Sequence, residues 1–83
     1  MHYVIKKEKR EELQEGRTIL YLAHKCKYSR QYLTDTFNAK IKITRECAVN
    51  ILRGISDDSI KLAVMINQKG INQTLDYFFE KVE

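Results

Sequence analysis

The chain has 83 residues, of which 43% are hydrophobic and 31% charged, and its formal net charge is +4. Those proportions are typical of a folded globular protein, and the length fits a single domain over residues 1–83 with little volume for a deep catalytic cleft. Its longest apolar runs are five residues, too short to cross a membrane, and no apolar leader precedes Lys6. The composition therefore predicts a cytoplasmic protein and argues against an enzyme.

Helical signals dominate the chain, which contains no proline and only three glycines. Residues 2–5 favour a short strand or an arm, and residues 6–15 form a highly charged segment that ends at Gly16. Thr18 can cap a helix whose apolar residues follow at helical spacing, and Ser29 can cap the next. The first half of the sequence thus predicts two short, consecutive helices.

The second half predicts two more helices. Thr44 can cap the first of them, whose apolar residues lie on one face as far as Ile55. Ser56 or Asp57 can cap the second, and Gly70 is expected to stop it.

The final segment leaves two alternatives open. Residues 73–79 suit a helix, whereas residues 77–82 also suit a strand that would pair with residues 2–5. The predicted fold class is mainly α: a small bundle of four or five short helices with a helix-turn-helix, with or without a short β pairing of the termini.

The net charge is unevenly distributed along the chain. Seven basic residues and one acid give residues 17–45 a charge of +6, whereas residues 55–83 carry −2. Such a basic block is either an ordinary solvated face or a footprint for a polyanion such as nucleic acid. The choice between them depends on the structure that the basic segment adopts.

Residues 19–38, with the sequence ILYLAHKCKYSRQYLTDTFN, have the pattern of a helix-turn-helix. Ala23 lies in the middle of one predicted helix, and Leu33 follows ten residues later in the next. A small residue lets two crossing helices approach closely, and a branched apolar residue fills the gap between them. The core that the two helices share would be completed by Leu22, Cys26 and Phe37.

This motif, over residues 22–38 and followed by a loop and an apolar helix, resembles the lambda-repressor-like family of the phage repressor and Cro type. The resemblance covers about residues 17–55, and the ending Phe37-Asn38 is particularly like that of the phage repressors. One departure is Lys27, which stands where the family usually has a glycine in the turn. A left-handed lysine costs about 1 kcal/mol. The resemblance implies a sequence-specific, double-stranded DNA-binding transcriptional regulator from a phage or mobile element.

The resemblance also implies that residues 29–38 form a recognition helix in the major groove. Arginine can bond to guanine, glutamine to adenine, and aspartate can accept from cytosine. The residues expected to contact bases are Arg30, Gln31, Thr34 and Asp35. The residues expected at the phosphate backbone are Thr18, Ser29, Tyr32, Asn38, Lys40, Lys42 and Thr44. The alternative for each is an ordinary solvated polar residue, and for Tyr32 a packing role.

Apolar excess in the last third of the chain leaves the oligomeric state open. A helix that is apolar on most sides lies either at the centre of a domain or against a partner. A homodimer interface and a monomer core are both consistent with the apolar residues Ile60, Leu62, Ala63, Val64, Met65, Ile66, Leu75, Tyr77, Phe78 and Phe79.

A second hypothesis for the function is a small protein-interaction module, for example a phage inhibitor of a host factor, built on the same fold. A catalytic site is not predicted, because His24 and Cys26 lie two apart on a helix and point apart, and Asp57 and Asp58 resemble a cap. Cys26 and Cys47 stand in no metal-ligand spacing, so both are interpreted as reduced, buried residues, and neither a metal nor a cofactor is expected.

Overall fold

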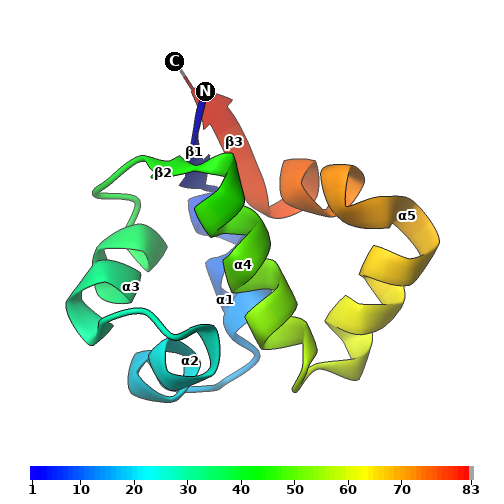
Figure 1. Cartoon of the computed structure of the whole chain (residues 1–83), viewed down its shortest axis with the longest axis horizontal. Helices are drawn as coiled ribbons and strands as arrows, with labels where there is room; N and C mark the ends of the chain where they lie inside the picture. Colours follow the sequence, from blue (N-terminus) through cyan, green and yellow to red (C-terminus); the bar gives the residue numbers. More distant parts are fainter. Residues whose placement is uncertain (83) are drawn as a thin grey trace.

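A computed structural model describes residues 1–82 of the chain. Within them, five α-helices and a three-stranded sheet form a mainly helical structure, as the sequence predicts (Figure 1). The elements, in chain order, are β1 (His2–Ile5), a 3-10 helix (Lys7–Lys9), α1 (Arg10–Gln14), α2 (Ile19–Cys26), α3 (Arg30–Phe37), β2 (Ile43–Thr44), α4 (Arg45–Ser56), α5 (Ile60–Phe78) and β3 (Phe79–Val82).

The sheet brings the two ends of the described chain together. Its strand order is β2-β1-β3, and both pairings are antiparallel. In the pairing of β1 with β3, His2 lies opposite Val82 and Ile5 opposite Phe79. The pairing of the termini, which the sequence left open, is present. The two alternatives for the last segment apply to consecutive residues: a helix continues to Phe78, and the strand follows it.

Side-chain caps fix where the helices begin. Thr18, Ser29 and Thr44 each accept a hydrogen bond from the backbone N–H three residues on, at 3.1 to 3.2 Å, as their sequence positions predict. The cap of α5 is Ser59, whose hydroxyl oxygen accepts from the N–H of Leu62. The prediction of Ser56 or Asp57 is wrong because α4 extends through Ser56 and uses Asp57 as its own C-cap.

Gly70 interrupts α5 without ending it. Its backbone has φ 83° and ψ 165°, a conformation that only glycine adopts without strain. The backbone is helical on both sides, and Thr74 donates a side-chain hydrogen bond to the carbonyl of Gly70 at 2.8 Å. Gly70 is therefore non-helical, as expected of a residue that stops a helix. The helix resumes directly after it, however, so that Gly70 forms a kink within α5 (Figure 1).

α4 runs through the middle of the molecule, with α2 and α3 on one side and α5 on the other (Figure 1). The apolar face predicted for this helix is fully buried: Ala48, Ile51, Leu52 and Ile55. It packs in one hydrophobic core with residues of every other α-helix and of all three strands. The core holds α2 and α3 against α4, and therefore fixes the orientation of the surface that these two helices present.

The turn between α2 and α3 contains a strained residue. Lys27 has φ 62° and ψ 36°, in the left-handed region, and its N–H donates to the carbonyl of Ala23. A side chain with a Cβ atom is disfavoured there. Lysine rather than glycine at this position therefore raises the energy of the turn but leaves the left-handed geometry in place.

We expect Lys27→Gly to raise the free energy of unfolding by about 0.5–1 kcal/mol, because glycine adopts this conformation without steric cost. The matched control is Lys25→Gly, which removes the same charge from a helical position and should lower the free energy of unfolding by about 1 kcal/mol. Urea unfolding followed by circular dichroism measures both. Equal losses in the two variants would contradict the strain at Lys27.

Candidate nucleic-acid interface

α2 and α3 are short helices joined by the turn at residues 27–29. Ala23 and Leu33, the pair that marks the predicted helix crossing, are both buried, and so is Phe37 at the end of α3. The N–H of Tyr28 donates to the carbonyl of Ala23 at 3.1 Å, which closes the end of α2. The helix-turn-helix geometry expected from the spacing is therefore built on the predicted core residues.

α3 divides into two faces. Leu33, Thr36 and Phe37 are buried. The four residues predicted to contact bases lie on the other side of the helix, with the first two exposed and the last two partly exposed: Arg30, Gln31, Thr34 and Asp35. Their spacing of one and four residues forms a continuous surface on a helix. The structure therefore brings these four side chains together.

Two of these side chains are hydrogen-bonded to each other. Nε2 of Gln31 donates to Oδ1 of Asp35 at 3.0 Å, across one helical turn. The hydroxyl of Thr34 donates to the carbonyl of Arg30 at 2.8 Å, so its oxygen can still accept a hydrogen bond from outside. The guanidinium of Arg30 has no partner in the part of the chain that the structure describes, and it extends from the first turn of the helix.

Three of the predicted phosphate-binding residues are the caps Thr18, Ser29 and Thr44. Each is exposed, and each uses its hydroxyl oxygen as an acceptor for the helix that it begins. A hydroxyl that accepts in this way keeps its proton for a second, outward hydrogen bond. Capping is therefore compatible with donation to a phosphate oxygen.

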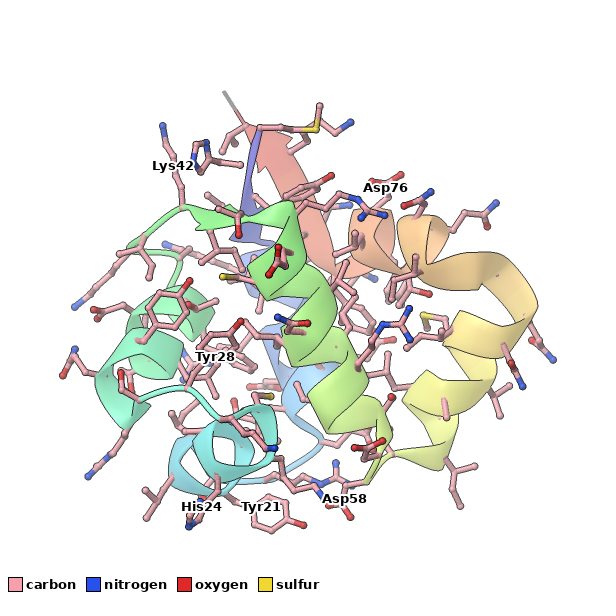
Figure 2. The ribbon with its side chains drawn as sticks, in the orientation of Figure 1. Tyr21, His24, Tyr28, Lys42, Asp58 and Asp76 are labelled. Carbon is pink, nitrogen blue, oxygen red and sulfur yellow. The ribbon has the colours of Figure 1, made fainter. Side chains whose placement is uncertain are left out.

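The loop after α3 contains the other predicted backbone contacts. Lys40 and Lys42 are exposed there, and Lys42 lies near the sheet (Figure 2). The C-cap residue Asn38 accepts a hydrogen bond at Oδ1 from a guanidinium nitrogen of Arg10, at 2.5 Å. The sequence did not indicate Arg10 as a surface residue beside α3, because 28 residues separate it from Asn38. Arg10 thus adds a cation at the C-terminal end of α3.

Tyr32 packs against the protein. Its ring lies 5.1 Å from the ring of Tyr28, and both are partly buried against the core. Burial, with a hydrogen bond to Cys47, raises the pKa of Tyr32 to about 12. Of the two roles predicted for this residue, the structure shows the packing one.

Part of the basic charge counted in residues 17–45 is neutralised by an ion pair with an acidic residue elsewhere in the chain. Nε of Arg17 lies 3.0 Å from Oδ2 of Asp58, which also accepts from the hydroxyl of Tyr21 at 2.7 Å. The hydrogen bonds from Tyr21 and Arg17 hold the pKa of the Asp58 carboxyl below its usual value. Arg45 donates to Asn72, a neutral partner that fixes the guanidinium but leaves its charge in place. The charge that faces solvent around α3 is therefore smaller than the sequence sum.

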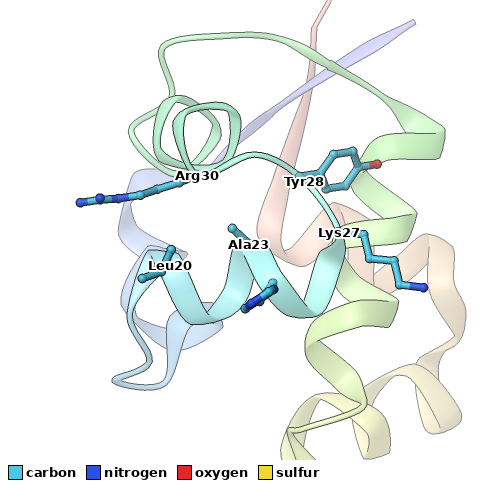
Figure 3. Close-up of a pocket in the computed structure, with 6 residues that line it drawn as sticks. Leu20, Ala23, Lys27, Tyr28 and Arg30 are labelled. Carbon is cyan, nitrogen blue, oxygen red and sulfur yellow. The ribbon is translucent and has the colours of Figure 1, made fainter.

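A hollow of about 240 Å³ lies between α2 and the start of α3 (Figure 3). Its lining residues are Leu20, Ala23, His24, Lys27, Tyr28 and Arg30. Leu20 is 59% exposed, although it stands in an apolar run of five residues, 19–23. The helical period distinguishes the buried from the exposed residues of this run: Leu22 and Ala23 lie on the buried side of α2, and Leu20 lies on the solvent side.

Three of the ten apolar residues considered for a dimer interface, Met65, Ile66 and Tyr77, are partly buried against the core, and the other seven fall into two groups. Leu62, Leu75, Phe78 and Phe79 are buried in the core of the single chain. Ile60 and Val64 are exposed, at 86% and 45%, and Ala63 lies exposed beside them. Only the second group forms a surface strip, at the start of α5.

Two further features bear on other kinds of site. Among residues 1–82, no group of three or more His, Cys, Asp and Glu side chains is arranged to hold a metal ion. Cys26 and Cys47 are free thiols, and both are only partly buried, so the interpretation of the two as buried residues is wrong. Desolvation still raises the pKa of Cys26 to about 11.

No helix in the described chain has both the length and the apolar character needed to cross a bilayer. Comparisons of the chain with protein-family models, with curated proteins and with solved structures found no match.

Proposed function

We propose that this protein is a sequence-specific, double-stranded DNA-binding transcriptional regulator, similar to the lambda-repressor-like repressors and Cro proteins of phages and mobile elements, and acting in the cytoplasm. The observation that carries the proposal is the exposed face of α3. Arg30, Gln31, Thr34 and Asp35 form one continuous polar surface there, while the opposite face of the helix is held in the core.

The side chains on this face match the hydrogen-bonding groups of the major groove. A guanidinium can donate two hydrogen bonds to guanine, and the amide of Gln31 can both donate and accept at adenine. The hydrogen bond from Gln31 to Asp35 leaves one oxygen of the carboxylate to accept from cytosine. Exposed hydroxyls and lysines before and after α3 supply donors for phosphates.

The salt dependence of DNA binding tests this function. Duplexes selected from a random pool would be titrated with the protein at 50 and 200 mM salt. With about six phosphate contacts, the affinity should fall by about a thousandfold over this range. Absence of duplex binding at the lower salt concentration would reject the proposal.

Two substitutions separate base contacts from phosphate contacts. Arg30→Ala should weaken binding to the preferred site by about 1–3 kcal/mol and relax the preference at one base pair, whereas Lys40→Ala should weaken all sequences alike and lower the salt slope by about one. The control is Lys69→Ala, an exposed lysine on α5. An unchanged preferred site in Arg30→Ala, measured by repeating the selection, would remove Arg30 from the base contacts.

The exposed strip of Ile60, Ala63 and Val64 on α5 favours a second candidate function, binding of a protein. A homodimer through this strip is one form of it, and dimeric regulators of this kind read two half-sites about one helical turn apart. A palindromic selected site together with a concentration-dependent mass in sedimentation supports the dimer. A monomer that binds no duplex supports an interaction module.

A further inference from the structure

Leu20 is an exposed apolar residue that lines the same hollow as Arg30 of the surface proposed for DNA. On α2, Leu20 and His24 lie one turn apart on the same side of the helix, and Lys27 follows the helix as its left-handed C-cap. All three residues line the same hollow as Arg30. Figure 3 shows Leu20 and Arg30 at one end of the hollow and extending to the same side, with Lys27 and Tyr28 at the other end.

The surroundings of Leu20 indicate the chemistry of its partner. The hollow contains two permanent cations, Lys27 and Arg30, and the imidazole of His24, which suits a polyanion. The polyanion must also offer an apolar group at the end of the hollow where Leu20 and Arg30 lie. In the major groove the C5-methyl of thymine is the apolar group among the base edges, and aliphatic side chains contact it.

We propose that Leu20 is a specificity-determining residue that contacts the C5-methyl group of a thymine beside the base pair read by Arg30. The inference rests on the DNA-binding function proposed above and extends the reading surface from α3 to α2. Arg30 supplies hydrogen bonds to a base edge, and Leu20 supplies an apolar surface that excludes water from the adjacent methyl group.

Replacement of thymine by uracil tests the contact, because uracil lacks only the methyl group and pairs identically. Each thymine of the selected duplex would be replaced singly by deoxyuridine, and binding measured to wild type and to Leu20→Ala. Burial of one methyl group corresponds to about a fourfold change in affinity. We expect one position at which uracil weakens wild-type binding about fourfold and has no effect on Leu20→Ala.

The control variant is Lys69→Ala, which truncates an exposed side chain on α5 outside both proposed binding surfaces and should keep the full response to uracil. Thermal unfolding checks that Leu20→Ala is folded, as the exposure of this side chain leads us to expect. Wild type that binds every uracil duplex as tightly as the parent overturns the inference. So does a result in which uracil, at every position where it weakens wild-type binding, weakens the binding of Leu20→Ala equally. Either outcome leaves DNA binding itself intact, whereas loss of the proposed function would appear earlier, as no binding to the parent duplex.

Discussion

Phe37→Ala should lower the free energy of unfolding by about 3–5 kcal/mol. The side chain is completely buried at the end of α3, so its removal costs both the transfer free energy of the ring and the cavity left behind. A chain of 83 residues has a total stability of only about 4–12 kcal/mol, so this one change removes a large share of it. Urea unfolding, followed by circular dichroism, measures the loss.

Phe37→Leu is the matched control, since it keeps an apolar side chain in the site and should cost less than half as much. If the residue acts only through folding, the folded fraction of each variant should bind DNA with unchanged sequence preference. A loss below about 1 kcal/mol in Phe37→Ala would contradict the central position of this ring in the core.

The second large effect concerns Gly54, which lies in α4 where α2 crosses it. A Cβ atom added at this position would stand 2.9 Å from Sγ of Cys26 and 3.1 Å from its Cα. Real Cβ atoms essentially never come as close as the first of these contacts, so the side chain of Cys26 or the backbone of α2 must shift. Alanine normally stabilises a helix interior by about 1 kcal/mol relative to glycine. We expect Gly54→Ala instead to destabilise the protein by about 1–3 kcal/mol.

A double-mutant cycle identifies the cause. Cys26→Ala removes the sulfur atom but keeps the backbone contact, so it should relieve part of the cost of Gly54→Ala and make the two changes non-additive. Arg53→Ala, at the exposed neighbouring position, should change the free energy of unfolding by less than about 0.5 kcal/mol. A stabilising Gly54→Ala would mean that the helices separate without cost.

The features that the sequence predicted well are encoded by neighbouring residues. A cap such as Ser29 acts three residues along the chain, and the pair Ala23 and Leu33 marks two adjacent helices. Both depend on local geometry, which has few solutions. The sequence did not identify Ser59 as the N-cap of α5, because several nearby polar residues can each begin a helix. The choice among them depends on where α4 ends, which the local sequence does not determine.

Apart from the pairing of the two terminal strands, which the sequence offered as one of two alternatives, contacts between distant parts of the chain could not be predicted. The hydrogen bond of Arg10 to Asn38 and the ion pair of Arg17 with Asp58 span 28 and 41 residues. Nothing in the local sequence distinguishes Arg17, which forms an ion pair with Asp58, from Arg30, which is exposed to solvent. A sum of charges therefore locates a basic segment but does not tell which of its cations remain available for a ligand.

The antiparallel pairing of β1 with β3 has a consequence for the order in which the chain folds. His2 pairs with Val82, so β1 and β3 can pair only when the two ends of the described chain have come together. α2 and α3 require only each other and nearby residues, and contacts of that kind form fastest. We therefore expect an early nucleus around the helix pair and a late closure of the sheet. The end of β3 lies beside the start of β1, so a short loop could join the two strands into a β-hairpin. The pairing that we expect to form last would then be a local one, and hairpins form within microseconds.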